Sequence, residues 1–583
     1  MKIRVAKTAG FCMGVRRAVN LVLEEARARE GELYTLGPLI HNDQVVQWLE
    51  RRGIRAVSEP EPGTRARLAI RSHGIGPQER HRLREQGFEL CDATCPRVGR
   101  VHGVVKKHHA QGYFIVVVGD PGHAEVEGIL GFAEGRAAVI SSPDQAAGLP
   151  EAGRVCVVAQ TTQSPERFAE VIAAVRRRYP ELGARELVVE DTICDSTHRR
   201  QREVKELARE VEAVVVVGGK NSANTKRLAE VAEAQGIPAF RVETEADLEW
   251  DRLRDFKRVA VTAGASTPQW LIRRVYEELA RRDRERKPWP LRFLYTFPRF
   301  LVLSNLFVAL GAASLCAAAT RLQGLALQPL ELLVSFCYVF SVHTFNVLIN
   351  REAIALNEPA RSRAFEHSRE LWIFFSLLSL LLAWVLAAIL GWKTFLLFTG
   401  AGIPGILYQV RILRRSRAPR LPFRALADIP GSKDIFMALG WTAVTAILPL
   451  ASQGFHLASP ATAVAALLVL GLVLLRSALQ DFRHLQGDRL VGHETLPIAL
   501  GERRARWLLF SLALALLLGL SLSAGLGLVP PLGFGLLLAV AYLGALIPLF
   551  SRRTTFQGLR AEFLVDFTFI LAGLITWAWE LVP

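Results

Sequence analysis

Long apolar runs in the second half of the chain constrain its fold more than any other feature. From Phe297 onward the sequence carries stretches such as Leu371–Leu390 and Trp507–Leu528, each long enough to cross a bilayer as a helix. Residues 1–290 instead carry charged residues throughout, and their apolar runs are only four to six residues long. A chain of 583 residues is also too long for one hydrophobic core. The sequence therefore predicts a soluble half followed by a membrane-embedded half.

The net charge of +16 has a better explanation than nucleic-acid binding. The basic residues gather in segments that alternate with short, nearly uncharged connections, which is the pattern of cytoplasmic and outer loops in a multi-pass membrane protein. These basic segments are Arg351–Arg369, Arg411–Lys433, Arg483–Arg506 and Arg552–Arg560. We therefore expect membrane lipid as a partner, and no nucleic acid.

About nine spans fit this pattern. They lie near residues 298–320, 330–350, 371–390, 394–410, 434–451, 460–480, 507–528, 531–550 and 562–582. The basic segments then follow an even number of spans, which places all of them and the soluble half in the cytoplasm. The first residues, MKIRVAKTAGFC, are charged and lack the apolar core of a cleavable signal. We expect a protein of the cytoplasmic membrane with its N-terminal half inside the cell.

The soluble half repeats one pattern, in which a short apolar strand leads through a polar turn into an amphipathic helix. Near-continuous apolar strands alternating with helices predict parallel α/β sheets, whose ligands bind beyond the carboxyl ends of the strands. Helix capping explains any single polar turn better than ligand binding does, but eight such turns together exceed what capping requires. The residues in these eight turns are Cys12, His41, His73, His123, Glu125, Thr161, Thr162, Cys194, Ser222, Asn224 and Ser266. Cys95, in the further turn DATCP, belongs with them.

The seven cysteines divide into packing residues and candidate ligands, because disulfides are not expected in the cytoplasm. Cys316 and Cys337 fall in apolar spans, and Cys156 falls in the strand VCVV. Cys91 competes for a ligand role, but its place at the end of the strand pattern FELC favours a structural role. Cys12, Cys95 and Cys194 remain. No close CxxC pair is present for zinc, so three separated thiolates favour an iron–sulfur cluster.

The other turns supply donors suited to a diphosphate. Three histidines, two serines and an asparagine can bind one without a Lys or Arg clamp when helix N-termini contribute. Glu125, two residues after His123, can supply a proton.

These residues carry a resemblance that extends over residues 1–282. The motifs occur in the order GFCMGVRRAV, IHN, SHG, DATCP, GHAEVEG, QTTQS, ICDST, GGKNSANTKRLAE and TAGAST. By these motifs the N-terminal half is identified as a member of the LytB/IspH family, the 4-hydroxy-3-methylbut-2-enyl diphosphate reductases. The resemblance implies an α/β trefoil of three subdomains around a [4Fe–4S] cluster held by Cys12, Cys95 and Cys194. It implies that Glu125 is the proton donor, with Thr161 and Thr162 beside it. It also implies a diphosphate site made of His41, His73, His123, Ser222, Asn224 and Ser266.

The resemblance further implies the reaction. The substrate hydroxyl binds the open iron, two electrons arrive singly from a ferredoxin- or flavodoxin-type donor, and protonation through Glu125 releases water. Protonation at either end of the resulting allyl species gives isopentenyl or dimethylallyl diphosphate. One departure is Ala223, where the family often has a second serine. The missing donor is worth about 1–3 kcal/mol if its partner stays unpaired.

The second half resembles the UbiA-type intramembrane prenyltransferases. The segment RSALQDFRHLQGDRLVGHETLPIALG, from Arg476, is similar to the family's second Asp-rich motif. Asp481 and Asp488 stand where carboxylates would hold Mg²⁺ and a prenyl diphosphate, but His484 replaces the middle Asp. In the first motif, from Asn346 to Arg361, the carboxylates are replaced by Val347, Asn350 and Ile354. Because a hard cation needs anionic oxygen ligands, one Mg²⁺ site is lost.

Three interpretations of the membrane half stay open: an altered transferase, a receptor for isoprenoid diphosphates, and an anchor.

For the whole chain we expect a reductase domain, residues 1–285, and a UbiA-like membrane domain of about nine helices, residues 286–583. The alternative is a redox sensor, in which the cluster reports to an isoprenoid-binding membrane domain. The complete set of diphosphate-binding turns disfavours the sensor, because a sensor does not need them.

Overall fold

The computed structural model describes residues 1–28, 32–59, 66–409, 431–491, 495–551 and 558–581. It divides into two compact units, Met1–Arg286 and Lys287–Pro583. Most of the basic segment Arg411–Lys433 and of Arg552–Arg560 lies outside the described residues, as do residues 492–494 within Arg483–Arg506.

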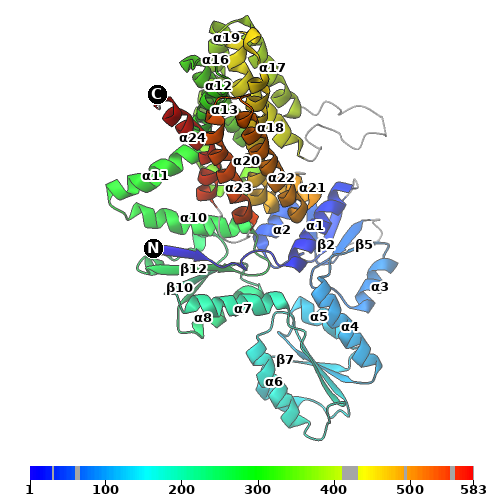
Figure 1. Ribbon diagram of the computed structural model, residues 1–583. Helices are drawn as coiled ribbons and strands as arrows, with labels where there is room; N and C mark the ends of the chain where they lie inside the picture. The colour runs from blue at the N-terminus through cyan, green and yellow to red at the C-terminus, as the bar shows by residue number, and fades with distance from the viewer. Residues whose placement is uncertain (29–31, 60–65, 410–430, 492–494, 552–557, 582–583) are drawn as a thin grey trace. The chain divides into compact units, whose positions relative to one another are not determined.

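The first unit contains three four-stranded sheets in which every strand pair is parallel, which confirms the predicted α/β class. One sheet has the order β1 (Lys2–Val5), β12 (Arg258–Ala263), β10 (Ala213–Val217), β11 (Ala239–Val242). The second has the order β3 (Ile54–Val57), β2 (Leu33–Leu36), β4 (Arg67–Ile70), β5 (Glu89–Asp92). The third has the order β7 (Ala137–Ile140), β6 (Phe114–Val118), β8 (Val155–Ala159), β9 (Leu187–Glu190). Figure 1 shows helices packed beside the strands of this unit.

All three sheets share one topology. If the strands of each sheet are numbered along the chain, β2 to β5 and β6 to β9 both adopt the spatial order 2-1-3-4. Strands β10, β11 and β12 adopt the order 2-1-3 in the same way, and β1 supplies the fourth strand by pairing with β12. The start of the chain therefore completes the last sheet.

Helices connect the strands of this unit. They are α1 (Met13–Ala28), α2 (Asp43–Glu50), α3 (Pro77–Glu85), α4 (Pro96–Ala110), α5 (Ala124–Leu130), α6 (Pro165–Arg178), α7 (Asp195–Ala208), α8 (Ala223–Glu233), α9 (Trp250–Leu253) and α10 (Gln269–Glu285). Strands β8 and β10 are buried along their whole length because helices cover both faces of a parallel sheet. The edge strands β3, β7 and β11 are partly exposed, and the sequence pattern does not indicate them.

The second unit is all helical in its described part. Its helices are α11 (Trp289–Leu303), α12 (Leu306–Leu322), α13 (Pro329–Ile349), α14 (Arg351–Asn357), α15 (Pro359–His367), α16 (Arg369–Ile389), α17 (Trp392–Gln409), α18 (Ser432–Thr442), α19 (Leu448–Gln453), α20 (Pro460–Val491), α21 (Leu496–Leu500), α22 (Glu502–Gly525), α23 (Leu532–Ser551) and α24 (Leu559–Glu580). A π-helical turn, Ala443–Ile447, joins α18 to α19. Seven helical segments of the described chain are long and apolar enough to cross a membrane. The pair α11–α12, bent by 69°, makes eight if it counts as one span, so the expected number of nine stays a prediction.

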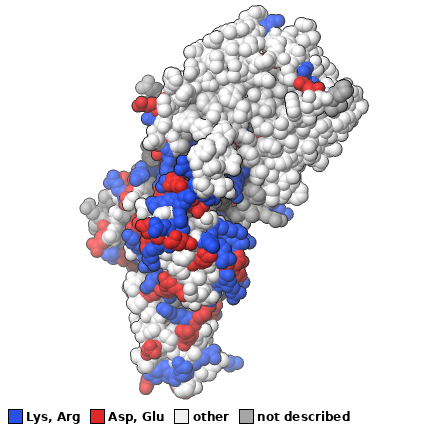
Figure 2. All heavy atoms as spheres, turned by 90° about the vertical axis from the view of Figure 1, so that its left-hand side faces the viewer, with Lys and Arg blue, Asp and Glu red and all other residues white. Residues whose placement is uncertain are grey.

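The surface of this unit is that of a membrane protein. Large apolar side chains such as Leu371, Phe374 and Leu381 on α16 are exposed rather than buried. The visible face of this unit is almost free of charged side chains, whereas the first unit shows both signs of charge (Figure 2). An apolar surface of this extent needs lipid around it, and the second unit is therefore a multi-pass membrane unit.

Candidate functional site

The shared topology places the candidate residues of the first unit at equivalent strand ends. The turn after the fourth strand of every sheet carries a cysteine: Cys95 follows β5, Cys194 follows β9, and Cys12 follows β1. The turns after the first and third strands carry the other candidates, namely His41, His73, His123, Glu125, Thr161, Thr162, Ser222, Asn224 and Ser266. The strand order reverses between the first and third strands, and such a reversal is where open α/β sheets bind ligands.

Each of the three thiols lies at the start of a helix. Cys95 and Cys194 are the N-cap residues of α4 and α7, and Cys12 precedes α1, where its Sγ accepts the Val15 N–H at 3.4 Å. Burial raises the pKa of Cys95 and of Cys194, and the charge of Cys12 raises both further, whereas backbone N–H groups at the helix starts lower them. The three thiols are therefore close enough to interact, and each faces donors that stabilise a thiolate.

The spacing of the thiols suits a cluster better than a single zinc ion. Two sulfurs on one zinc lie less than about 4.6 Å apart, because each Zn–S bond is about 2.3 Å. Among the described residues, three histidines are the one group whose donor atoms all lie within 4.8 Å of one another, so at least one pair of the three sulfurs is farther apart than that. The sulfur of Cys95 also lies directly against Gly14 of α1: a Cβ on that glycine would be 2.2 Å from it. The donor set and its spacing therefore fit an iron–sulfur cluster.

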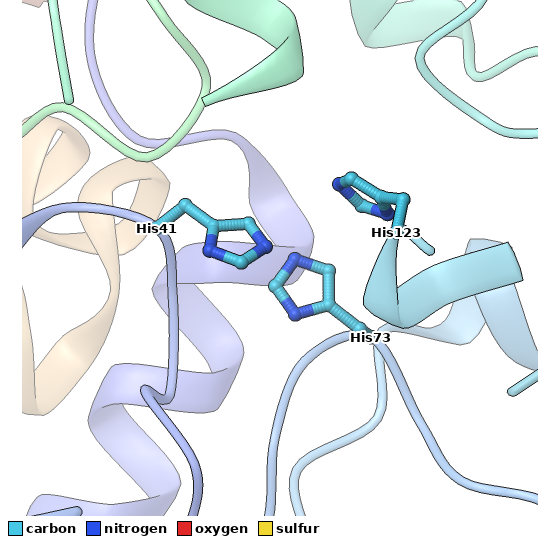
Figure 3. Close-up of side chains that lie close together, drawn as sticks. All are labelled: His41, His73 and His123. Carbon is cyan, nitrogen blue, oxygen red and sulfur yellow. The ribbon is translucent and has the colours of Figure 1, made fainter. Parts of the chain in front are cut away.

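The histidine set consists of His41, His73 and His123, whose rings point toward one another from three separate turns (Figure 3). The ring centroids lie 4.5 Å apart for His41 and His73, and 5.3 and 5.5 Å from His123. Burial lowers the pKa of His41 to about 4 and that of His73 well below 6.5. It also lowers the pKa of His123. The three histidine rings are therefore neutral at neutral pH, and a bound anion would raise their pKa again.

Arg71 is a residue of this site that the sequence pattern does not reveal. It directly follows β4, next to Ser72, and its charge lowers the pKa of all three histidines. Its Nε atom is buried without a hydrogen-bond partner. A guanidinium beside the histidines disfavours a metal cation there and favours a phosphate, for which arginine supplies fixed donors.

The serine turns join the histidine set through direct contacts. The Ser266 Oγ donates to the His41 carbonyl at 3.0 Å, and Gly219 lies so close that a Cβ on it would be 2.8 Å from the same carbonyl oxygen. Ser222 is the N-cap residue of α8 and accepts the Thr225 N–H at 3.4 Å. Asn224 lies in the first turn of the same helix. Ser266 and Gly219 therefore lie against the turn that carries His41, and Ser222 and Asn224 lie at the helix N-terminus that follows Gly219, a place suited to an anion.

Glu125 is buried beside this set. Its carboxylate accepts the Thr161 N–H at 2.6 Å and the Thr161 Oγ1 hydroxyl at 2.9 Å. Burial raises the pKa of Glu125, and the two bonds from Thr161 oppose that shift. The Glu125 N–H donates to His123 Nδ1 at 3.1 Å, which leaves the proton of the neutral ring on Nε2. Thr162, the next residue of the turn, is half-buried.

The remaining cysteines of this unit lie in strands. Cys91 is in β5 opposite Ala69, and burial raises the pKa of its thiol to about 11. Cys156 is buried in β8, where burial raises its pKa to about 12. Both are therefore neutral thiols at pH 7, as packing residues are.

In the membrane unit, Asp481 and Asp488 are both buried on α20. Asp488 accepts a hydrogen bond from Asn357 Nδ2 at 2.8 Å. Asp481 contacts Asp434 of α18, which the Ser477 hydroxyl also contacts, and its own Oδ2 atom is buried without a partner. Asp434 is the residue that motif comparison missed, and it makes a set of three carboxylates.

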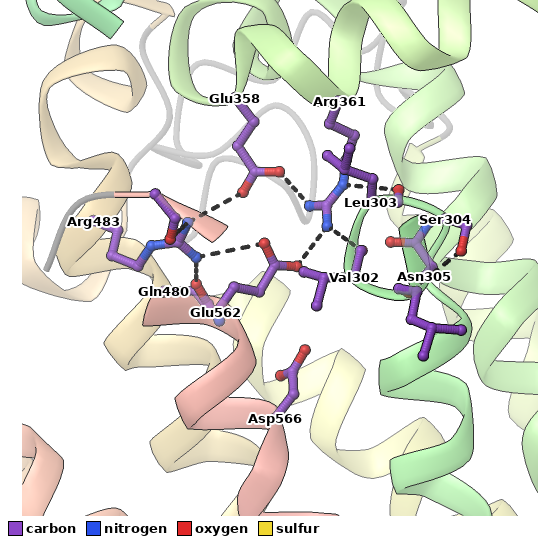
Figure 4. Close-up of polar contacts among 12 residues, drawn as sticks. Val302, Leu303, Ser304, Asn305, Glu358, Arg361, Gln480, Arg483, Glu562 and Asp566 are labelled. Atoms are coloured by element: carbon purple, nitrogen blue, oxygen red, sulfur yellow. Dashed lines mark hydrogen bonds and ion pairs between the residues drawn. The ribbon is translucent and has the colours of Figure 1, made fainter. Parts of the chain in front are cut away.

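The first Asp-rich segment is closed by protein groups. Val347 is buried, and Asn350 Nδ2 donates to Asn346 Oδ1 at 2.8 Å. Just beyond it, Arg361 binds Glu358, Glu562 at 2.6 Å and the carbonyl of Val302 at 2.8 Å (Figure 4).

This ion network extends to neighbouring helices. Arg476 pairs with Asp566 at 2.6 Å, and Arg483 lies 3.8 Å from Glu562 and 3.9 Å from Glu358. His484, which replaces the middle Asp of the second motif, lies 2.9 Å from Glu358. Among the described residues, three arginines face three carboxylates in this network.

The fold and these sites define the class of the protein: an α/β reductase unit joined to a helical membrane unit. The chain belongs to the LytB protein family, whose model matches residues 3–280, and the model of the UbiA prenyltransferase family matches residues 294–572. The 4-hydroxy-3-methylbut-2-enyl diphosphate reductase of Geobacter sulfurreducens is 45% identical over 287 residues, which cover 49% of this chain and 100% of the relative.

Two solved structures are also similar. One, a structure of (E)-4-hydroxy-3-methyl-but-2-enyl diphosphate reductase, is 39% identical with a TM-score of 0.39 and covers 48% of this chain and 100% of its own. The other is a UbiA homolog from Archaeoglobus fulgidus bound to DMAPP and Mg²⁺. It is 16% identical with a TM-score of 0.33, and the match covers 48% of this chain and 99% of the homolog.

Proposed function

We propose that the first unit reduces 4-hydroxy-3-methylbut-2-enyl diphosphate to isopentenyl and dimethylallyl diphosphate. The observation that carries this proposal is the shared topology of the three sheets. It brings a thiol from the fourth strand of each sheet to the strand ends where the histidines, serines and Glu125 gather.

Cys12, Cys95 and Cys194 would hold a [4Fe–4S] cluster. When bound, the cluster supplies the electrons and an open iron position for the substrate hydroxyl. The electrons would come from a ferredoxin- or flavodoxin-type donor in the cytoplasm, where the basic loops of the membrane unit would place the reductase.

The diphosphate would occupy the set of histidines, serines and Asn224, with Arg71 beside it. Binding an anion there favours protonated histidines, so the site takes up protons as the substrate binds. Glu125 would deliver the proton that removes the hydroxyl group as water. Its buried position raises the carboxyl pKa toward neutrality, which keeps more of it protonated, and the Thr161 bonds fix its orientation.

The test is anaerobic turnover of the full-length protein in detergent, with the hydroxylated diphosphate and a low-potential reductant. Glu125→Gln should lose activity by about 10²–10⁴-fold while it retains its iron, because a positioned proton donor contributes that much. Cys91→Ser is the matched control and should keep both iron and activity. Full iron with no turnover in the wild type would instead support the redox-sensor hypothesis.

The membrane unit has a second candidate function, as a Mg²⁺-dependent binder of prenyl diphosphates. Its support is the set of Asp434, Asp481 and Asp488, buried together with one carboxylate oxygen unpartnered. Asp481 also faces the charge of Lys433, and buried carboxylates in contact need a proton or further positive charge between them. Since Arg361 and its partners close the first motif, we infer one cation site rather than two.

Isothermal titration of the full-length protein with a short prenyl diphosphate at several Mg²⁺ concentrations tests this candidate. Binding should depend on Mg²⁺ and should be lost in the Asp481→Asn, Asp488→Asn double variant, whereas the exposed control Glu370→Gln should bind normally. Equal binding by the wild type and the double variant, or none by either, would leave the membrane unit as an anchor.

A further inference from the structure

One buried cation of the first unit has no ion partner. Arg200, on α7, is 3% exposed. Its Nη1 donates to the Ala263 carbonyl at 3.0 Å and its Nη2 to the Gly10 carbonyl at 2.6 Å. Across the described chain, its guanidinium has no ion pair with a carboxylate within 4.0 Å, and its third contact is the Ser196 hydroxyl at 3.4 Å. A buried guanidinium held only by dipoles is costly unless a negative charge lies near it.

The negative groups near Arg200 are candidate cluster ligands. Burial lowers the pKa of Arg200, and the charges of Cys12, Glu203 and Cys194 oppose that shift. The carboxylate of Glu203 is engaged elsewhere, with the backbone N–H groups of Lys7 and Thr8. Arg200 therefore lies among Glu203 and two candidate cluster ligands, and two of its own hydrogen bonds go to Gly10 and Ser196, each two residues from one of those cysteines.

The equivalent positions in the other two sheets show that packing alone does not require an arginine. Each of the helices α1, α4 and α7 begins after a cysteine, and Arg200 lies six residues after Cys194. The residues six positions after Cys12 and Cys95 are Ala18 and Val101, both fully buried. Two of the three equivalent sites hold a small or branched apolar residue, and only α7 places a cation there.

We propose that Arg200 is the buried counter-charge of the iron–sulfur cluster and sets its reduction potential. The proposal rests on the assignment of Cys12, Cys95 and Cys194 as cluster ligands. A fixed positive charge stabilises the cluster more after it gains an electron, so it raises the potential. The two carbonyl bonds hold that charge in place between the turn that carries Cys12 and the turn that carries Ser266.

The test is a redox titration of the cluster, followed by electron paramagnetic resonance, in the anaerobic full-length protein in detergent. The variants are Arg200→Gln, which removes the charge, and Arg200→Lys, which keeps it. Arg202→Gln, an exposed arginine on the same helix, is the matched control for a lost charge. Arg200→Gln should lower the equilibrium constant for one-electron reduction at least tenfold, which is 59 mV. The Lys variant and the Arg202 control should stay within threefold of the wild type.

Iron content separates this proposal from the assignment on which it rests. A wild-type protein without iron would refute the cluster itself. A wild-type potential in an iron-loaded Arg200→Gln protein would overturn the role of Arg200 alone. If Arg200→Gln loses its iron, the Lys variant decides: retained iron supports the counter-charge, because lysine restores the charge but not the forked geometry. Equal loss in both variants would show that Arg200 is only a structural bridge.

Discussion

The close contact between Gly14 and Cys95 makes a single methyl group a sharp test of the thiol site. Gly14 is the second residue of α1, and its backbone conformation is helical, so alanine is compatible with the local structure. The added Cβ would lie 2.2 Å from the Cys95 sulfur and 3.0 Å from the Cys95 Cβ. Any loss caused by Gly14→Ala therefore comes from this contact and not from helix propensity, which favours alanine.

The size of the displacement follows from ordinary contact distances. Non-bonded heavy atoms approach to about 3.5 Å, so the sulfur or the helix must move by more than about 1 Å. Metal–ligand distances tolerate only about 0.2 Å. Cys95 is the N-cap residue of α4, so a shift of its backbone would also move the start of that helix. We expect Gly14→Ala to fold but to lose most of its cluster.

Iron and sulfide analysis of anaerobically purified full-length protein measures this outcome, with visible absorbance as a second readout. Gly99→Ala is the matched control, because Gly99 lies on α4 with no atom within 4 Å of an added Cβ. It should keep its iron and gain about 0.5–1 kcal/mol of stability from helix propensity. Wild-type iron content in Gly14→Ala would refute the placement of Cys95 against α1.

Three further predictions follow from the described contacts. The affinity for inorganic diphosphate should fall as pH rises, because the bound anion raises the lowered pKa of the three histidines and the complex then holds more protons than the free site; calorimetry in buffers of different ionisation enthalpy should show proton uptake, and none would contradict it. Thr161→Val removes a donor to the Glu125 carboxylate, so it should raise the carboxyl pKa and move the alkaline limb of kcat to higher pH; an unmoved or lowered limb would argue against Glu125 as the donor. Glu562→Gln leaves buried Arg361 short of a counter-charge and should cost about 3–5 kcal/mol, seen as a lower thermal midpoint in detergent, whereas Glu580→Gln, in a partly exposed pair, should change it little.

Local patterns account for most of the fold that sequence could predict. Apolar strands followed by polar turns indicate parallel sheets, because a strand buried on both faces must be apolar along its length. The edge strands β3, β7 and β11 escaped this pattern; each is only partly buried, and β3 and β11 each carry an arginine. The membrane helices were indicated by their length and apolar composition for the same kind of local reason.

Charged residues show where local pattern stops being informative. Arg71, Arg200 and Asp434 occur in segments that contain other charged residues, and nothing in the local sequence separates them from surface charges. Their burial depends on elements distant in the chain: Arg200 is held by the carbonyls of Gly10 and Ala263, 190 and 63 residues away. Only the assembled structure identifies them as parts of a site.

By itself, the sequence determined the class of each half, the turns that carry chemistry and the residue types in those turns. Motif order was enough for this, because a strand end and the helix that follows it are encoded within about ten residues. Tertiary structure decided which turns meet. It placed β1 beside β12 and so brought Cys12 near Cys95 and Cys194, and it gave each sheet the same strand order, with the cysteine on the fourth strand. The physical reason is that strand neighbours are chosen by burial and packing over the whole unit, and such contacts leave no periodic trace in the sequence of either strand.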